Sequence, residues 1–543
     1  MLLRVENLTI RFGAGQEPVV RDISFQVGEA ETLGIVGESG SGKSVSCFSL
    51  LKLLPKSAEV SGKVSYKDKS GKEVDLLTLN NTQLQQYRGK EIGFVFQEPM
   101  SSLNPAYTCG DQVAEGIRKH KKCSRKEAQA KTISLFEEVL LPDPSRVWKA
   151  YPHELSGGQR QRVMIAMALA SDPRLLIADE PTTALDVTVQ KVVVELIKKL
   201  SEQRNMGVIF ISHDLNLVGS MADRILVMKS GEIVEMGMTK DIFEKPQHSY
   251  TQNLLQCRPS RNWHLPRLPV PGLVAKPVLP QENTGNPILL KAENLSKSYI
   301  SGSGWWGKNA ETKAVVAVSF DIEKGKTLGI VGESGSGKST ISRLVLGLTP
   351  ITSGKVYFGN DEISGLNRKQ FRPYRRQMQM IFQDPYSSLN PKHSIGSILT
   401  EPMDIFGIGN KKERLDKAEY LLKKTGLPAE YLHRYPHQLS GGQRQRVCIA
   451  RALMTDPAFI ICDESVAALD VSVQAQVLNL LKDLQDELGL TYLFITHDLA
   501  VARFMSHQLL VMQKGKAEEY GKAADIFSNP SSAYTKKLLD SVV

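Results

Sequence analysis

Two stretches with the same sequence, GESGSGKS, have the residue types and spacing of a phosphate site. They lie at residues 37–44 and 332–339 and fit the pattern G-x-x-x-x-G-K-[ST] of a phosphate-binding loop (P-loop). The glycines let backbone N–H groups turn inward around phosphates, and the lysines Lys43 and Lys338 add positive charge at the β- and γ-phosphates. The residues expected to surround the phosphates are Gly37, Glu38, Ser39, Gly40, Ser41, Gly42, Lys43 and Ser44 in the first loop, and Gly332, Glu333, Ser334, Gly335, Ser336, Gly337, Lys338, Ser339 and Thr340 in the second. The sequence therefore predicts two nucleotide sites.

Two pairs of acidic residues end apolar runs, in LLIADE (175–180) and FIICDE (459–464). An aspartate at the end of a strand beside a P-loop suits Mg²⁺, and the glutamate that follows suits a general base for an attacking water. The predicted roles are Mg²⁺ binding for Ser44, Ser339, Asp179 and Asp463, and general-base catalysis for Glu180 and Glu464.

The residues after these acids differ between the two copies. ADEPTTALD (178–186) corresponds to CDESVAALD (462–470), so that Pro181 and Thr182 are replaced by Ser465 and Val466. Loss of a proline changes stability by roughly 0.4–1 kcal/mol, whereas loss of a general base lowers the rate by about 10²–10⁴-fold. Because both acids are kept, we predict that both sites hydrolyse nucleotide.

A third repeated motif, LSGGQ, occurs at 155–159 and 439–443. A serine and two glycines that open a helix present N–H groups and a hydroxyl at the positive end of the helix dipole, which suits a second phosphate-binding surface. Beside a P-loop, this motif resembles the signature of ATP-binding cassette (ABC) ATPases, and the resemblance covers nearly the whole chain twice. The signature residues are Leu155, Ser156, Gly157, Gly158 and Gln159, and Leu439, Ser440, Gly441, Gly442 and Gln443.

The resemblance implies further roles. In this family the signature of one cassette closes over the P-loop of the other, so 37–44 would face 439–443, and 332–339 would face 155–159. The family assigns Gln97 and Gln383 to Q-loops, which belong to the metal site, sense Mg²⁺ and couple to a membrane partner. It assigns His213 and His497 to switch histidines that reach the γ-phosphate, and Phe12 and Tyr299 to stacking on adenine.

Short β-branched runs precede these motifs, as in TLGIVG (32–37) and GVIFIS (207–212), and helix-compatible segments follow them. This alternation predicts an α/β fold with a mainly parallel sheet. The resemblance specifies two P-loop NTPase domains, each with an antiparallel β portion and a helical subdomain.

The repeat divides the chain into a first cassette at 1–258, a proline-rich linker at 259–287 and a second cassette at 288–543. The first copy carries eleven extra residues between the P-loop and the signature, mostly around 66–75, which predicts a surface loop. The second copy carries an insertion at 301–312 with Trp305 and Trp306. We interpret it as a partly covered loop, with contact to a partner or to lipid headgroups as the alternative.

The composition favours a globular protein that works in a reducing compartment. The formal net charge of +10 suits phosphates, anionic membranes or nucleic acid without choosing among them. The six cysteines show no paired spacing, and Cys462 is expected to be a small buried residue. The N-terminus lacks a signal-peptide layout, and no apolar run is long enough to cross a bilayer.

Other stretches resemble the oligopeptide/dipeptide/nickel importer ATPases, and the fusion of two such ATPases resembles the microcin C- and glutathione-type peptide importers. These stretches are FQEPMSSLNP (96–105), FQDPYSSLNP (382–391) and the tails DIFEKPQHSYTQNLL (241–255) and DIFSNPSSAYTKKLL (525–539). The resemblance implies ATP-driven peptide import, with two membrane permease subunits and an extracytoplasmic substrate-binding protein as partners. It also implies peripheral attachment to the cytoplasmic face of the inner membrane.

Related separate-chain ATPases often carry a cysteine cluster after the tail, but only Cys257 lies near that place, so we expect no iron–sulfur cluster. The main alternative is a soluble twin-cassette ATPase that acts on ribosomes or nucleic acid. Such proteins usually have a long charged helical linker, whereas this linker is short and proline-rich, so we expect no nucleic-acid partner. The sequence leaves the transported substrate open among peptides, glutathione, nickel and other small solutes.

Overall fold

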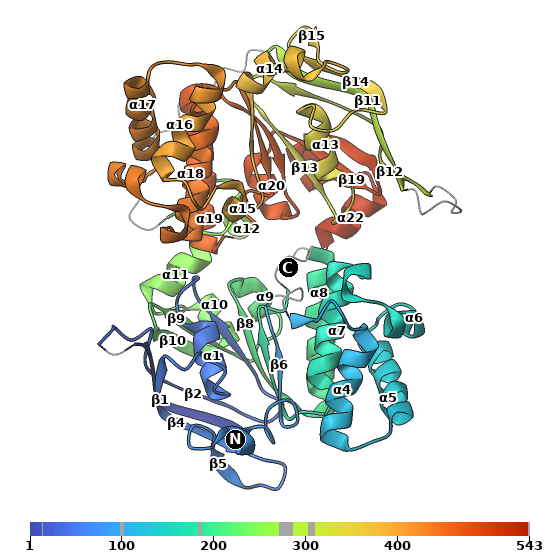
Figure 1. Cartoon of the computed structure of the whole chain (residues 1–543), viewed down its shortest axis with the longest axis vertical. Coiled ribbons are helices and arrows are strands. Elements are labelled where there is room, and N and C mark those ends of the chain that lie inside the picture. The colour runs from blue at the N-terminus through green and yellow to red at the C-terminus, as the bar shows by residue number, and fades with distance from the viewer. Residues whose placement is uncertain are drawn as a thin grey trace. The chain divides into compact units, whose positions relative to one another are not determined.

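The computed structural model describes residues 1–13, 15–97, 102–182, 187–270, 286–301, 310–467 and 469–540. Their contacts divide the chain into two compact units, Met1–Leu255 and a second that begins at Gln256 (Figure 1). Trp305 and Trp306 lie outside the described residues.

The main sheet of the first unit has six strands in the order β10-β9-β3-β8-β7-β6. Their bounds are β3 (Thr32–Val36), β6 (Ile92–Val95), β7 (Leu175–Asp179), β8 (Gly207–Ser212), β9 (Arg224–Lys229) and β10 (Glu232–Met238). Only the pairing of β10 with β9 is antiparallel; the other neighbours are parallel. All residues of β3, β7 and β8 are buried, as expected for parallel strands covered on both faces.

A second, antiparallel sheet in this unit has the order β2-β1-β4-β5. Its strands are β1 (Leu3–Phe12), β2 (Val20–Val27), β4 (Ala58–Lys67) and β5 (Glu73–Asp75). The insertion predicted as a loop at 66–75 is instead largely a hairpin between β4 and β5, because Asp68 accepts the backbone N–H groups of Ser70 and Lys72 and so closes the turn.

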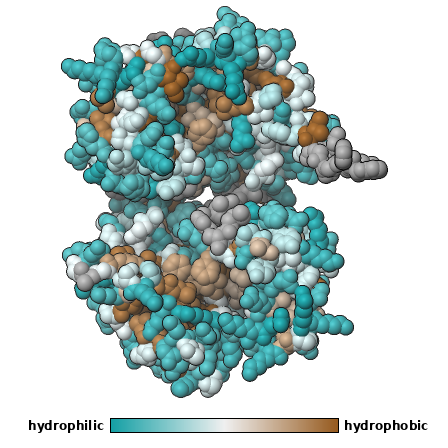
Figure 2. Space-filling model, viewed as in Figure 1, coloured by the Kyte–Doolittle hydropathy of each residue, from teal (hydrophilic) through white to brown (hydrophobic). Residues whose placement is uncertain are grey.

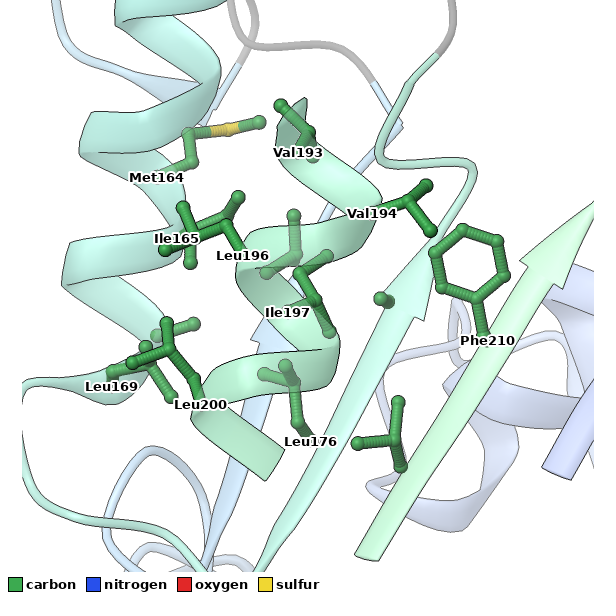
Figure 3. Packing of buried hydrophobic residues seen from close by; sticks show 14 of the residues in the cluster. Met164, Ile165, Leu169, Leu176, Val193, Val194, Leu196, Ile197, Leu200 and Phe210 are labelled. Carbon is green, nitrogen blue, oxygen red and sulfur yellow. The ribbon is translucent and has the colours of Figure 1, made fainter. Parts of the chain in front are cut away.

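The helices of the first unit are α1 (Lys43–Leu50), α2 (Asn81–Leu84), α4 (Cys109–Lys121), α5 (Arg125–Glu138), α6 (Pro144–Lys149), η1 (Pro152–Glu154), α7 (Gly157–Leu169), α8 (Val187–Arg204), α9 (Leu215–Gly219), α10 (Thr239–Glu244) and α11 (Ser249–Gln256). Helices α4, α5 and α6 lie together beside α7 as a helical subdomain (Figure 1). Figure 3 shows how α7 and α8 pack over β7 and β8 through Met164, Ile165, Leu169, Leu176, Val193, Val194, Leu196, Ile197, Leu200 and Phe210. Each such buried side chain contributes roughly 1.5–3 kcal/mol to folding, and together they fix the strand ends that carry Asp179 and Ser212.

The second unit repeats this plan, with sheets in the orders β16-β17-β18-β13-β19-β20 and β12-β11-β14-β15. Its strands are β11 (Ile288–Ser301), β12 (Ala310–Glu323), β13 (Thr327–Gly332), β14 (Ser353–Phe358), β15 (Asp361–Glu362), β16 (Met378–Ile381), β17 (Phe459–Asp463), β18 (Thr491–Ile495), β19 (Gln508–Gln513) and β20 (Lys516–Lys522). Its helices are α12 (Pro259–Asn262), α13 (Lys338–Val345), α14 (Arg368–Gln377), α15 (Pro385–Ser388), α16 (Ile395–Phe406), α17 (Lys411–Lys424), η2 (Ala429–His433), η3 (Pro436–Gln438), α18 (Gly441–Leu453), α19 (Val471–Leu488), α20 (Leu499–Met505), α21 (Ala523–Ser528) and α22 (Ala533–Asp540). The predicted α/β fold, with a mainly parallel sheet, an antiparallel portion and a helical subdomain in each copy, is confirmed.

The first part of the predicted linker, residues 259–270, packs on the second unit. Leu268 is buried, and its backbone N–H and carbonyl both bond the side-chain amide of Asn479 on α19, at 2.8 Å each. Arg267 forms ion pairs with Asp483 at 2.7 Å and Asp486 at 2.6 Å on the same helix. A stretch with no period of its own is thus ordered by side chains that lie more than two hundred residues further along the chain.

Among the described residues, no helix is both long and apolar enough to cross a membrane. On the face drawn in Figure 2, hydrophilic residues cover most of each unit, and hydrophobic residues are confined to smaller areas.

Candidate active site

Each P-loop connects a buried strand to a helix, β3 to α1 and β13 to α13. Gly42 and Gly337 precede these helices with φ of 97° and 103°, a conformation that favours glycine. A Cβ on Gly337 would also lie 2.4 Å from the carbonyl oxygen of Ala314. The glycines therefore let the loop turn tightly and direct the first N–H groups of the helix into it.

The P-loop lysines fold back over their own loops. Lys43 Nζ donates to the carbonyl oxygens of Gly37 at 2.7 Å and Glu38 at 2.8 Å. Lys338 makes the same two bonds in the second loop, at 2.8 and 2.9 Å. Both lysines are buried, so their charges are concentrated on the loop and not dispersed into solvent.

The serine that follows each lysine bonds the aspartate at the end of the neighbouring strand. Ser44 Oγ donates to Asp179 Oδ1 at 2.8 Å, and Ser339 Oγ donates to Asp463 Oδ1 at 3.1 Å. Burial raises the pKa of Asp179 to about 6 and outweighs the opposite effect of the Ser44 hydrogen bond; the pKa of Asp463 is raised for the same reason. Asp179 Oδ2 is buried and has no hydrogen-bond partner among the described residues. A carboxylate that is short of partners beside a hydroxyl fits a small divalent cation such as Mg²⁺.

The carboxylate of the glutamate after each aspartate is contacted by a glutamine and a histidine from two other loops. Gln97 Nε2 donates to Glu180 Oε2 at 2.9 Å, and Gln383 Nε2 donates to Glu464 Oε2 at 2.8 Å. The corresponding histidines also lie beside the carboxylates, with His213 Nδ1 3.4 Å from Glu180 Oε1 and His497 Nδ1 3.3 Å from Glu464 Oε2. The structure thus brings the predicted Q-loop residues to the glutamates.

The glutamates themselves are held in an uncommon backbone conformation. Glu180 and Glu464 have φ of 45° and 47°, and their N–H groups donate to the carbonyls of Ile211 and Ile495 on the adjacent strands. Positive φ in a residue other than glycine persists where the surroundings enforce it, often at functional sites. The backbone therefore turns the same way in both copies.

The glutamate and histidine of the second unit stabilise each other's charges. Burial alone would raise the pKa of Glu464, but the hydrogen bond and charge of His497 lower it. Burial likewise would lower the pKa of His497, but Glu464 raises it above its ordinary value. This pairing keeps the carboxylate ionised and able to accept a proton from water.

The signature serines cap helices α7 and α18. Ser156 Oγ accepts the N–H of Gln159, and Gln159 Oε1 accepts the N–H of Ser156, a capping box that Ser440 and Gln443 repeat. The N–H groups of the two glycines that open each helix have no partner within the helix, as at any helix start. The arrangement can therefore present N–H groups to an anion.

The second glycine of each signature lies against the helix that follows the acidic pair. A Cβ on Gly158 would lie 2.6 Å from Val189 Cγ1, and one on Gly442 would lie 2.3 Å from Val473 Cγ1. These positions require glycine because the two helices pack closely there.

The remaining predicted residues lie at the ends of long strands. Phe12 ends β1 and packs partly buried against the core, whereas Tyr299 on β11 is 42% exposed, with Lys297 Nζ 5.1 Å from its ring centroid.

Cys462 is fully buried, and burial raises the pKa of its thiol to about 12, so it is not a nucleophile. Cys257 is buried in the core of the second unit.

Sequence reasoning missed two residues at the P-loops, Tyr250 and Tyr534. Their hydroxyls accept backbone N–H groups of the loops. The available signal was that SYT and AYT recur at the same place in the two tails.

Comparison with known families and proteins now defines the class. The ABC transporter family matches residues 20–183 and 315–467. The C-terminal region of oligopeptide/dipeptide transporters matches 234–276 and 519–543. The chain therefore belongs to the ABC transporter family: it is an ATPase with two ATP-binding cassettes, each followed by an oligopeptide/dipeptide transporter region.

More specifically, the chain resembles glutathione import ATP-binding proteins. Those of Escherichia coli strain K12 and Shigella dysenteriae serotype 1 are 44% identical over 100% of this chain and 89% of their own length. That of Salmonella choleraesuis is 45% identical with the same coverage. These relatives are named as import ATP-binding proteins, and together with the transporter region they favour a transporter ATPase over a soluble ATPase that acts on ribosomes or nucleic acid.

Solved structures of single cassettes also match. The dimeric bacterial ABC transporter cassette MJ0796 is 33% identical and covers 43% of this chain and 98% of its own, with a TM-score of 0.39. The cassette cbiO1 from Clostridium perfringens is 27% identical and covers 45% and 92%, with a TM-score of 0.40.

Proposed function

We propose that this chain energises the import of short peptides of the glutathione class through a membrane permease. One observation carries the proposal: both cassettes hold the full set of lysine, serine, aspartate, glutamate, glutamine and histidine contacts, and each is followed by an oligopeptide/dipeptide transporter region. The 44% identity to a glutathione import ATP-binding protein, over the whole of this chain, supports this substrate class over nickel.

The chemistry proposed for each cassette is in-line attack of water on the γ-phosphate of ATP. Glu180 or Glu464 accepts a proton from the water, a new O–P bond forms, and the bond to the β-phosphate oxygen breaks to give ADP and phosphate. The histidine beside each glutamate orients the carboxylate, while the P-loop lysine stabilises the negative charge that develops on the phosphate oxygens.

Mg²⁺ would be held by the serine–aspartate pairs, Ser44 with Asp179 and Ser339 with Asp463, and it would neutralise charge on the β- and γ-phosphates. The unpartnered Asp179 oxygen supports this assignment. Gln97 and Gln383 belong to the proposed Mg²⁺ site, and because they also donate to the glutamates, they would connect the cation to the general base.

The composite arrangement is proposed from the family resemblance. The P-loop at 37–44 would bind ATP together with the signature at 439–443, and the P-loop at 332–339 together with 155–159. Phe12 and Tyr299 would stack on the adenines. The division into cassettes at 1–258 and 288–543 with a linker at 259–287 belongs to the same proposal.

The proposed partners are two permease subunits and an extracytoplasmic substrate-binding protein, with attachment to the inner membrane through the permeases and no nucleic-acid partner. We also propose that the chain holds no iron–sulfur cluster, because Cys257 is the one cysteine near the family's cluster position.

Purification of the tagged chain from detergent-solubilised membranes tests the proposal. We expect permease subunits to copurify, and the reconstituted complex to take up glutathione in an ATP-dependent manner that Glu180→Gln with Glu464→Gln abolishes. Sedimentation with ribosomes and never with a permease would overturn the import function. Uptake of a nickel salt without uptake of glutathione or dipeptides would overturn the substrate class alone.

A further inference from the structure

The tails that follow the two cassettes each place a tyrosine hydroxyl on a P-loop. The N–H of Glu38 donates to Tyr250 Oη at 3.2 Å, and the N–H of Glu333 donates to Tyr534 Oη at 3.3 Å. Tyr250 lies near the start of α11 and Tyr534 near the start of α22, about two hundred residues from the loops that they contact. The same contact forms in both copies although the surrounding tail sequences differ.

Glu38 and Glu333 are each held from two sides. The carbonyl of Glu38 accepts Lys43 Nζ at 2.8 Å, while its N–H is bonded to Tyr250; in the second loop, Lys338 and Tyr534 hold Glu333 in the same way. The lysine is the group that phosphates attract, so bound nucleotide competes with the carbonyl for its ammonium group. The tyrosine carries no charge, so the phosphates attract it less strongly than they attract the lysine.

The tyrosines are fixed independently of the P-loops. In the first unit Glu235 on β10 accepts the N–H groups of Gln247 at 2.7 Å and His248 at 3.1 Å, just before α11. The N–H of Tyr250 donates to His248 Nδ1 at 3.1 Å. Tyr250 is buried, and Lys229 Nζ lies 5.0 Å from its ring centroid.

The second unit builds the same support from other residues. Glu519 on β20 accepts the N–H groups of Ser531 at 2.8 Å and Ser532 at 3.2 Å, and the N–H of Tyr534 donates to Ser532 Oγ at 3.2 Å. Serine replaces histidine, but the strand glutamate and the tyrosine are kept. In both units the hydroxyl is therefore presented from a strand-anchored turn.

We propose that Tyr250 and Tyr534 are positioning residues of the ATP sites: their hydroxyls hold the first residues of each P-loop in the phosphate-binding conformation when the lysine turns from the loop carbonyls to the phosphates. The oligopeptide/dipeptide transporter region is by this proposal a structural part of the nucleotide site. The proposal concerns nucleotide binding and does not depend on which solute is transported. An experiment that contradicts it would therefore leave the proposed substrate class intact, and the reverse also holds.

The test removes only the hydroxyls, in Tyr250→Phe, Tyr534→Phe and the double variant. Tyr520→Phe is the matched control, because Tyr520 lies on β20 and its hydroxyl bonds the backbone carbonyl and the carboxylate of Asp321. For the double variant, one lost neutral hydrogen bond per site predicts that the KM for ATP and the Kd for ADP rise by about three- to tenfold while kcat stays within about twofold. The control is expected to keep both constants.

Hydrogen exchange gives a second, local measurement that does not depend on activity. Tyr250→Phe should speed amide exchange in the peptide containing residues 37–44 and leave 332–339 unchanged, and Tyr534→Phe should do the reverse. A fall in Tm with unchanged KM, Kd and loop exchange would overturn the proposal, because the rings would then act only in packing. A fall in kcat at unchanged KM would also overturn it.

Discussion

The two copies of the cassette share the contacts of the proposed active site but differ on the helix after the acidic pair. On α19 of the second unit, Asn479 and two aspartates, Asp483 and Asp486, bind the start of the linker. The corresponding positions on α8 of the first unit are Glu195, Lys199 and Glu202. Glu195 is exposed. The active-site contacts are therefore duplicated, while this helix surface is specialised in one copy for ordering the linker.

The two copies also use different side chains, Asp223 and His507, to bind the backbone at the start of the P-loop strand. The N–H of Thr32, at the start of β3, donates to Asp223 at 2.8 Å, whereas the N–H of Thr327, at the start of β13, donates to His507 Nδ1 at 3.1 Å. Both acceptors hold the start of the P-loop strand. The carboxylate accepts over a wide pH range, but the imidazole nitrogen accepts only when it is unprotonated.

The largest expected effect comes from removing the proposed general bases. Glu180→Gln and Glu464→Gln each keep the side-chain size and remove the charge, and the near-identical contacts of the two glutamates predict that each single variant lowers turnover. The double variant should lose about 10²–10⁴-fold. Phosphate release under saturating ATP measures this. Wild-type ATPase and transport in Glu464→Gln would show that the second site is structural and that the copies differ in chemistry after all.

Disruption of the linker anchor should affect the second unit alone. Asn479→Ala leaves the buried N–H and carbonyl of Leu268 without their partner, which predicts a loss of about 1–3 kcal/mol in the free energy of unfolding. Glu195→Ala at the matching exposed position of α8 should change it by less than about 0.5 kcal/mol. Urea unfolding followed by tryptophan fluorescence compares the two. Equal effects would contradict the specialisation of α19.

Exchange at the turn after the acids should have a smaller effect. Pro181 and Ser465 follow glutamates with nearly the same φ, and both lie in turns, so the proline is compatible with either copy. Ser465→Pro should raise the free energy of unfolding by about 0.4–1 kcal/mol, and Pro181→Ser should lower it by a similar amount, with turnover unchanged. Thermal unfolding and ATPase assays are the measurements. A large loss of turnover in either variant would mean that the turn residue itself sets the activity of its copy.

The smallest expected effect is on the pH dependence of stability, through His507. Burial of part of the ring, with Lys326 and Lys482 nearby, lowers the pKa of His507 to about 4 in the folded state, against an unfolded value near 6.5. The unfolded state then binds more protons between these values, so stability is lost as pH falls from about 6.5 to 4. Although the surrounding protein desolvates the ring, the residue as a whole keeps a large solvent-exposed area, so screening should reduce the loss well below the ~1.4 kcal/mol per pH unit of a fully shifted group.

Thermal unfolding of wild type and His507→Asp between pH 7.5 and 5 measures this contribution. The variant reproduces the Asp223 arrangement of the first copy and should show a smaller fall of Tm on acidification. An identical fall in both proteins would show that this position does not distinguish the copies.

The repeated motifs made most of the site predictable, because each is a short local pattern whose chemistry follows from its residue types. The P-loop, the acidic strand ends and the signature serine need only their immediate neighbours to take their conformations. The hairpin at 66–75 was predicted as a loop because Asp68 closes its turn through side-chain bonds that composition does not reveal.

The sequence by itself thus determined the two-cassette architecture, the α/β class and the set of residues proposed for each phosphate site. Only the tertiary structure decided that Gln97 and Gln383 bond the glutamates, that Tyr250 and Tyr534 hold the P-loops, and that the linker's first residues pack on α19. The physical reason is distance along the chain. These contacts join residues about eighty to more than two hundred positions apart, and only the packed sheets bring them within hydrogen-bond reach.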